Sequence, residues 1–206
     1  KLPEVETTRR GLEPVMVGRR ITRVLAHRKD LRVPLPPKFK ERLEGKTIAA
    51  LRRRAKYLLI DLDSGDSILA HLGMSGSFVV TKTHGYALKT HDHVLFSLDN
   101  GHICVFNDPR RFGVIDLIKT QKSHQHPLLK DLGPEPFSED FSEKYLKEKL
   151  SRRKGAIKPV LMDQKLVVGV GNIYASEALH LCGINPSISA NKSVFYAKDI
   201  IAAIKQ

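Results

Sequence analysis

The sequence is poor in cysteine and in aromatic residues. It has two cysteines, no tryptophan and an aromatic content of 6%. Cys104 and Cys182 have no closely spaced partners, so they cannot form a zinc site of the usual kind, and we expect buried thiols. So few rings also disfavour a binder of single-stranded nucleic acid, which needs regularly spaced rings for base stacking.

Long apolar runs are absent as well. No run in the chain approaches the roughly 20 residues of a membrane-spanning helix. The N-terminus carries the acidic residues Glu4 and Glu6 where a signal peptide would be basic and then apolar. We therefore expect a cytoplasmic protein without a membrane partner.

Positive charge is what the sequence has in excess. The chain holds 35 Lys and Arg against 22 Asp and Glu, a net charge of +13. Residues 1–60 carry 17 basic and 6 acidic side chains, so they hold 11 of these 13 surplus charges. Such a concentration indicates a polyanionic partner, with nucleic acid first, whereas a merely well-solvated surface would spread its charges.

The first part of the chain has the pattern of a helix followed by short strands. Residues 2–17 predict a helix, because Pro3 suits a first turn and Gly18 supplies a stop. Turn signals at 64–66 and 99–101 separate strand-like segments at hairpin spacing. The predicted strands cover residues 21–26, 57–62, 67–72, 93–98, 103–107 and 113–118. This part is expected to be an antiparallel β-sandwich or barrel.

After residue 118 the pattern becomes helical. Ser142 can cap a helix to about residue 153, a short helix covers 157–163, Asn172 can cap a helix to about 182, and Ser193 can open a last one to about 205. The predicted fold class is α+β: an antiparallel β-sandwich with a flanking helix over residues 1–120, a linker over 121–138, and an all-α domain over 139–206.

Two segments could contact a nucleic acid, one a glycine turn and one a basic run. Gly169-Val170-Gly171-Asn172 leads into a helix whose first N–H groups can hold a phosphate, and Lys158 precedes this turn. Arg52-Arg53-Arg54-Ala55-Lys56 is strand-like, so two-residue alternation predicts Arg52, Arg54 and Lys56 on one face. Simple turn chemistry and a solvated strand edge are the alternatives.

Two other segments could act on a base stack. In Asp108-Pro109-Arg110-Arg111-Phe112-Gly113, an arginine can hydrogen-bond a base edge while the ring wedges into a gap. Met74, between Gly73 and Gly76, is either a core residue or an exposed wedge, and Phe112 has the same two interpretations. His91-Asp92-His93 lacks a third metal ligand, so a phosphate or structural contact is favoured over a metal.

Taken together, five motifs resemble the formamidopyrimidine-DNA glycosylase family, in the same order along nearly the whole chain. They are Leu2-Pro3-Glu4-Val5-Glu6-Thr7, Arg54-Ala55-Lys56-Tyr57-Leu58-Leu59, His71-Leu72-Gly73-Met74-Ser75-Gly76, Asp108-Pro109-Arg110-Arg111-Phe112-Gly113 and Gly169-Val170-Gly171-Asn172-Ile173-Tyr174-Ala175-Ser176-Glu177. The resemblance implies a β-sandwich and a helical domain with a helix-two-turn-helix that hold double-stranded DNA, as a monomer.

The resemblance also implies roles for single residues. The family removes oxidised purines, such as 8-oxoguanine and formamidopyrimidines, with an N-terminal proline amine that forms an imine and then cleaves the strand as an AP lyase. The expected catalytic residues are Lys56, Glu4 and Glu177. The expected DNA contacts are His91, Arg110, Arg152, Lys158 and Asn172. Met74, Arg110 and Phe112 resemble the side chains that fill the space left by the everted nucleotide.

The sequence departs from the family pattern at both ends. The family has Pro-Glu before Leu-Pro-Glu-Val-Glu, whereas Lys1 precedes Leu2 here, so the chain as printed is expected to bind DNA with impaired catalysis. The family's four-cysteine zinc finger is expected in a part beyond residue 206, so no metal or other cofactor is expected in this chain. The alternatives are a non-catalytic module that binds damaged DNA and a glycosylase of the endonuclease VIII type for oxidised pyrimidines.

Overall fold

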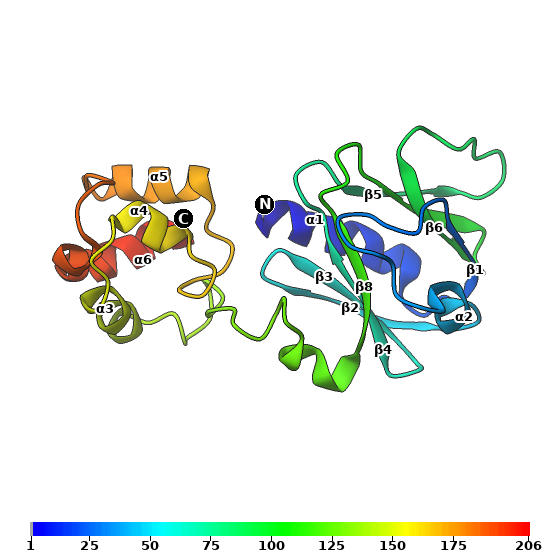
Figure 1. The fold of residues 1–206 in the computed structure, drawn as a ribbon, viewed down its shortest axis with the longest axis horizontal. Helices are drawn as coiled ribbons and strands as arrows, with labels where there is room; N and C mark the ends of the chain where they lie inside the picture. The colour runs from blue at the N-terminus through cyan, green and yellow to red at the C-terminus, as the bar shows by residue number, and fades with distance from the viewer. Residues whose placement is uncertain (1) are drawn as a thin grey trace. The chain divides into compact units, whose positions relative to one another are not determined.

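The computed structural model describes residues 2–206 and divides them into two compact units (Figure 1). One unit holds residues 3–126, and the other holds residues 127–206 together with residue 2. Lys1 lies outside the described residues, so the expectation for that position stays a prediction. None of the helices in residues 2–206 combines the length and the apolar character that crossing a bilayer requires.

The first unit contains two four-stranded antiparallel sheets. The strand orders are β1-β6-β7-β5 and β2-β3-β4-β8. The strands are β1 (Ile21–Ala26), β2 (Ile48–Arg54), β3 (Tyr57–Leu62), β4 (Asp66–His71), β5 (Ser77–Lys82), β6 (Asp92–Leu98), β7 (His102–Asn107) and β8 (Val114–Lys119). Buried residues of both sheets form one hydrophobic cluster, so the predicted β-sandwich is confirmed. The sequence analysis did not predict β5, and its list of strands also lacked β2, of which only residues 52–54 were described as strand-like.

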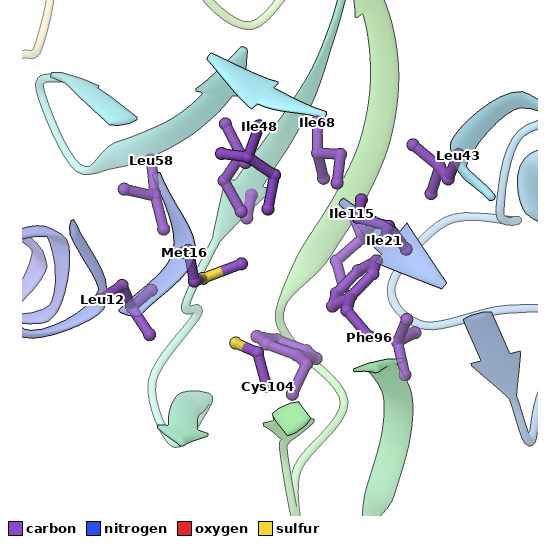
Figure 2. Packing of buried hydrophobic residues seen from close by; sticks show 14 of the residues in the cluster. Leu12, Met16, Ile21, Leu43, Ile48, Leu58, Ile68, Phe96, Cys104 and Ile115 are labelled. Carbon is purple, nitrogen blue, oxygen red and sulfur yellow. The ribbon is translucent and has the colours of Figure 1, made fainter. Parts of the chain in front are cut away.

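Helix α1 (Leu2–Met16) contributes to the same core, and helix α2 (Phe39–Leu43) packs beside β1. Val5, Leu12 and Met16 recur at near-helical spacing and are buried, as an amphipathic helix requires. Figure 2 shows Met16 among buried side chains that include Leu58 of one sheet and Cys104 of the other. The helix is therefore anchored to the core along its length, at Val5, Leu12 and Met16.

The remaining elements are helical. They are η1 (Thr120–Gln125), α3 (Glu143–Ser151), α4 (Ile157–Met162), α5 (Asn172–Leu181), η2 (Ala190–Tyr196) and α6 (Ala197–Lys205). All of them except η1 belong to the second unit, whose core is a separate hydrophobic cluster. Ser142 caps α3 as predicted, because its Oγ accepts a hydrogen bond from the Tyr145 N–H at 3.2 Å.

Two predicted helix starts are wrong. Gly171 is the N-cap of α5 in an extended conformation, so Asn172 is already the first helical residue and caps nothing. Ser193 lies inside η2, where its hydroxyl donates to the Ser189 carbonyl, and α6 begins only at Ala197. In both cases a polar residue able to cap lies inside the helical turn instead of before it.

Candidate nucleic-acid interface

Lys56 lies in the tight turn of the β2–β3 hairpin. The chain ends β2 at Arg54, turns through Ala55 and Lys56, and begins β3 at Tyr57. Ala55 is buried and has a φ of 53°, which an alanine adopts only when its surroundings hold it there. The prediction that Arg52, Arg54 and Lys56 share one face of a strand is therefore wrong for Lys56, because β2 ends at Arg54 and the chain reverses through Ala55 and Lys56. Arg52 and Arg54 do lie two residues apart in β2.

Arg52 is committed to an ion pair within this hairpin. Its Nη2 lies 2.9 Å from Oδ1 of Asp61 on the facing strand β3. The hydrogen bonds with Asp61 raise the pKa of the Arg52 guanidinium. The basic run thus contains at least one arginine that holds the sheet together.

The segment after β4 presents Met74 to solvent. The side chain of Met74 is 61% exposed, which decides between the two interpretations in favour of an exposed residue. The segment is ordered at its start, where the Gly73 N–H donates to Nδ1 of His71 at 3.1 Å. The ring of His71 in turn packs on Tyr57, the residue that follows Lys56, with centroids 4.9 Å apart. The turn that carries Lys56 and the segment that carries Met74 are therefore neighbours.

Arg110 and Phe112 are exposed together between β7 and β8. The guanidinium carbon of Arg110 lies 4.7 Å from the centroid of the Phe112 ring, a cation–π contact. Phe112 is 44% exposed, so it is not the core residue that an ordinary hairpin would need. Arg111, between the two, has a φ of 57°, so the chain turns at this residue.

The Met74 segment and the Arg110 segment touch through their backbones. A Cβ added to Gly73 would lie 2.5 Å from the carbonyl carbon of Phe112 and 2.7 Å from the Gly113 nitrogen. Only a residue without a side chain allows this approach. The structure thus brings together Met74, Arg110 and Phe112, the three residues predicted from sequence to fill a gap in DNA.

His91 is exposed in the turn directly before β6 and has a φ of 73°. The next residue, Asp92, is buried and fixes this segment, because it accepts hydrogen bonds from Tyr86 Oη at 2.6 Å and from the Lys89 N–H at 2.8 Å. Although burial favours the neutral carboxyl, hydrogen bonds from Tyr86 and Asn107 lower the pKa of Asp92. Burial and Asp92 raise the pKa of Tyr86 to about 12, so this pair stays intact at neutral pH.

His93 points into the protein instead of toward a ligand shared with His91. Its Nε2 lies 2.8 Å from the Asp108 carbonyl oxygen, and it is buried. Among residues 2–206, no three His, Cys, Asp or Glu side chains are grouped so that they could hold a metal ion. The zinc that the family resemblance implies therefore has no fitting set of ligands in the described part of the chain.

In the second unit, the glycine turn before α5 is built as an open helix start. Gly169 has a φ of 85°, and its N–H donates to Oε1 of Gln164 at 2.9 Å. Gln164 also donates to the Val170 carbonyl at 3.0 Å, so one side chain holds the turn. The N-cap of α5 is Gly171, which has no side chain to cap the helix, so the first N–H groups, at the positive end of the helix dipole, have no side-chain cap from it.

The other residues predicted in this unit have different surroundings. Lys158 is half-buried near the start of α4, and its N–H donates to the Pro186 carbonyl. Glu177 is exposed on α5, beside His180 in a shallow surface hollow. Arg152 is exposed and pairs with Glu148 one turn earlier at 3.0 Å. Asn172 is exposed at the first position of α5.

The sequence analysis missed the residues that support these segments. Ser75, Arg53, Tyr86 and Asp92 received no role, and Asp108 was quoted only as part of a motif. Some of their partners are far away along the chain, 33 residues for Ser75 and Asp108 and 47 residues for Arg53 and Glu6. Tyr86 and Asp92, by contrast, are partners only six residues apart. The available signal was the presence of polar residues inside motifs that otherwise supply exposed groups.

Comparison with known proteins shows similarity along both units. The family model of the formamidopyrimidine-DNA glycosylase N-terminal domain matches residues 1–115, and that of the formamidopyrimidine-DNA glycosylase H2TH domain matches residues 132–204. The formamidopyrimidine-DNA glycosylase of Xanthomonas euvesicatoria is 53% identical over 193 residues, and that of Dinoroseobacter shibae is 49% identical over 203 residues. Each alignment covers 93% of this chain and 70% of the relative.

Solved structures show the same similarity. The Lactococcus lactis formamidopyrimidine-DNA glycosylase, bound to DNA that contains an AP site, matches with a TM-score of 0.90 at 36% identity, over 99% of this chain and 77% of that one. The protein of Thermus thermophilus matches with a TM-score of 0.86 at 35% identity, over 100% of this chain and 73% of that one. Family models, relatives and solved structures thus agree that this chain belongs to the formamidopyrimidine-DNA glycosylase family.

Proposed function

We propose that this chain is the sandwich and helix-two-turn-helix part of a base excision repair DNA glycosylase with AP lyase activity, which removes oxidised purines such as 8-oxoguanine from double-stranded DNA. Membership of the family supports this function. One observation of the chain itself carries it: Met74, Arg110 and Phe112 are exposed together on two segments that touch. Exposed apolar side chains beside an arginine suit a protein that fills a gap in a base stack.

The three exposed side chains have separate roles in the proposal. Met74 and Phe112 replace the stacking of the everted nucleotide, and Arg110 hydrogen-bonds the cytosine left without its partner. His91, Lys158, Arg152 and Asn172 contact phosphates, and these contacts fix the register of the protein on the duplex without reading its sequence. The open N-terminus of α5 adds N–H donors at Asn172.

The proposed chemistry uses an N-terminal amine ahead of Leu2. Its nitrogen bonds to C1′ of the damaged nucleotide, while the base leaves with the electrons of its glycosidic bond and takes up a proton. Opening of the sugar ring gives an imine, and loss of a proton from C2′ then eliminates the phosphate. A terminal amine suits this attack, because its pKa of about 7.7 to 8.0 leaves more free base at neutral pH than a lysine at about 10.4.

Lys56, Glu4 and Glu177 have supporting roles in this proposal. Lys56 contacts phosphate and assists the elimination from the hairpin turn, and Glu4 and Glu177 organise the catalytic end. No step uses a metal, so the zinc of the family resemblance stays a prediction for a part beyond residue 206. A cytoplasmic location and a monomeric state also stay predictions.

Trapping the imine with borohydride tests this function. The duplex carries 8-oxoguanine opposite cytosine, and the protein carries the family's Pro-Glu in place of Lys1. We expect a covalent adduct that depends on borohydride and is missing when guanine replaces 8-oxoguanine. Lack of an adduct, together with tight binding to an abasic duplex that stays uncut, would favour the non-catalytic binding module instead.

A further inference from the structure

Asp108 is completely buried at the start of the segment that carries Arg110 and Phe112. Its Oδ1 accepts a hydrogen bond from Ser75 Oγ at 2.6 Å, and its Oδ2 accepts one from the Gly113 N–H at 2.8 Å. Ser75 directly follows Met74, and Gly113 directly follows Phe112. One buried carboxylate therefore joins the two segments that carry the exposed side chains.

The Ser75 hydroxyl makes a second link between the same segments. Besides donating to Asp108, its Oγ accepts a hydrogen bond from the Arg110 N–H at 3.2 Å. The Ser75 side chain thus holds the backbone of the other segment at Arg110. A buried hydrogen bond to a carboxylate is stronger than one between neutral groups, so this link resists separation of the segments.

The backbones of the two segments also pack closely against each other beside these hydrogen bonds. Gly73 has a φ of 58° and approaches the Phe112 carbonyl group so closely that no Cβ fits. The segments are therefore in contact on both sides of Met74: at Gly73 by packing and at Ser75 by two hydrogen bonds. By contrast, the side chains of Met74 and Phe112 themselves are exposed, and the Phe112 ring is in contact with Arg110 of its own segment.

We propose that Ser75 and Asp108 are positioning residues that couple the two segments, so that Met74, Arg110 and Phe112 enter the DNA as one preformed unit. This inference rests on the proposed function, because it needs the three side chains to occupy a gap in a duplex. Its physical advantage is entropic: a unit that is already ordered loses little conformational freedom on binding, whereas two independent segments would each have to be ordered by the DNA.

The first test measures binding without chemistry. The probe is a duplex with a tetrahydrofuran abasic analogue opposite cytosine, titrated by fluorescence anisotropy, with an undamaged duplex as reference. Ser75→Ala is expected to weaken binding to the abasic duplex about fivefold, as loss of one or two hydrogen bonds would, and to change binding to the undamaged duplex by less than about twofold. Equal changes for both duplexes would overturn the inference.

The second test measures the coupling itself through double-mutant cycles. In the wild-type background, Met74→Ala and Phe112→Ala are expected to be non-additive in abasic-duplex affinity, because loss of either side chain already spoils the unit. In the Ser75→Ala background the same pair is expected to become additive. A cycle that is unchanged by Ser75→Ala contradicts the coupling. A merely structural role of Ser75 would not alter this cycle.

Ser67→Ala is the matched control. Ser67 Oγ donates to Asp61 Oδ1 at 2.6 Å, a serine–aspartate bond of the same length in the same unit, near the opposite end of β4 from Met74. The control is expected to lower the melting temperature and leave the affinity ratio of the two duplexes unchanged. A shift of that ratio equal to that of Ser75→Ala would contradict the inference.

Three further cases complete the tests. If Ser75→Ala does not fold, Asp108→Asn replaces it, since an amide offers one acceptor oxygen for the two donors and should shift the affinity ratio in the same direction. If the wild-type protein binds abasic and undamaged duplexes equally, the proposed function fails. If it prefers the abasic duplex and neither variant shifts that preference, only the coupling fails.

Discussion

The carboxylate of Glu6 on α1 lies 3.1 Å from the Arg53 guanidinium at the end of β2, and Arg53 also donates to the Ala55 carbonyl at 3.0 Å. Glu6 pairs in addition with Arg9 at 3.0 Å and with Arg10 at 2.9 Å. The hydrogen bond from Arg9, with those from Arg10 and Arg53, outweighs partial burial and lowers the pKa of Glu6 to about 2. The ion pair between Glu6 and Arg53 thus holds the first turns of α1 to the β2–β3 turn that presents Lys56.

Glu6→Gln is expected to reduce stability in a pH-dependent way. The pKa of Glu6 is lowered in the folded state, so its contribution is complete above the unfolded-state pKa of about 4.3 and is lost as the pH falls toward 2. Because the side chain is a quarter exposed, we expect a loss of about 1 kcal/mol at pH 7. Urea denaturation from pH 7 to pH 2 should show the difference between wild type and variant shrinking below about pH 4.

Glu13→Gln is the control for this charge cluster. Glu13 bonds Arg9 at 2.8 Å but is 47% exposed and has no link to β2. Its loss should cost about 0.5 kcal/mol or less. A larger cost for Glu13→Gln than for Glu6→Gln would show that contacts within α1, instead of the link to Arg53, carry the stabilisation.

Lys158→Ala and Arg110→Ala are expected to separate phosphate contact from base contact. Removal of a phosphate contact should weaken binding to every duplex and reduce the slope of log affinity against log salt by about 1. Removal of Arg110 should instead lower the discrimination between cytosine and adenine opposite the lesion by about 1 to 3 kcal/mol. Titrations at several salt concentrations, with both opposite bases, measure both quantities.

Equal effects of Lys158→Ala and Arg110→Ala on salt dependence and on discrimination would contradict these roles. Lys154→Ala is a useful reference, because Lys154 is an exposed lysine four residues before Lys158 and was given no role. It should change the salt slope less than Lys158→Ala does. A steeper loss for Lys154→Ala would place the phosphate contact outside the predicted residues.

Much of the fold follows from local pattern. The period of Val5, Leu12 and Met16, with Gly18 after them, indicates where α1 lies and ends, and the structure agrees to within one residue. Strand β5 was missed because its neighbours Met74 and Gly76 blur the start of its alternation. The hairpin at Lys56 was missed for a different reason: its turn uses Ala55 at a positive φ, a position where glycine or asparagine is the usual signal.

The candidate site could be predicted only in part. Exposed residues inside motifs, such as Met74 and Phe112, gave a signal because apolar groups beside glycines are unusual in a strand. Ser75 and Asp108, which support them, are visible in the motifs only as polar residues, because the tertiary fold decides that these two become partners. A sequence pattern records which groups are present, whereas hydrogen bonds such as that between Ser75 and Asp108 depend on how two distant turns are brought together.

The two cysteines are expected to differ in their reaction with a thiol reagent. Burial raises the pKa of Cys104 to about 12, so the reactive thiolate is scarce and the sulfur is shielded between the sheets. Burial and Asp199 also raise the pKa of Cys182, which is only partly buried. In the native protein, mass spectrometry should find slow alkylation of Cys182 and none of Cys104 until urea unfolds the protein. Faster reaction of Cys104 would contradict this packing.

Gly73→Ala is expected to be among the most damaging single-methyl changes in the first unit. A φ of 58° costs alanine about 1 to 2 kcal/mol, and the new Cβ would also lie 2.5 Å from the carbonyl carbon of Phe112. Backbone cannot move aside as a flexible side chain can, so we expect a total loss of about 3 kcal/mol or more, measured by urea denaturation.

Gly85→Ala is the control that isolates the backbone strain, because Gly85 has a φ of 76° and open space around it. It should cost only about 1 kcal/mol. Equal losses for the two variants would mean that the contact between Gly73 and Phe112 is loose, and the two segments would then be joined by Ser75 alone.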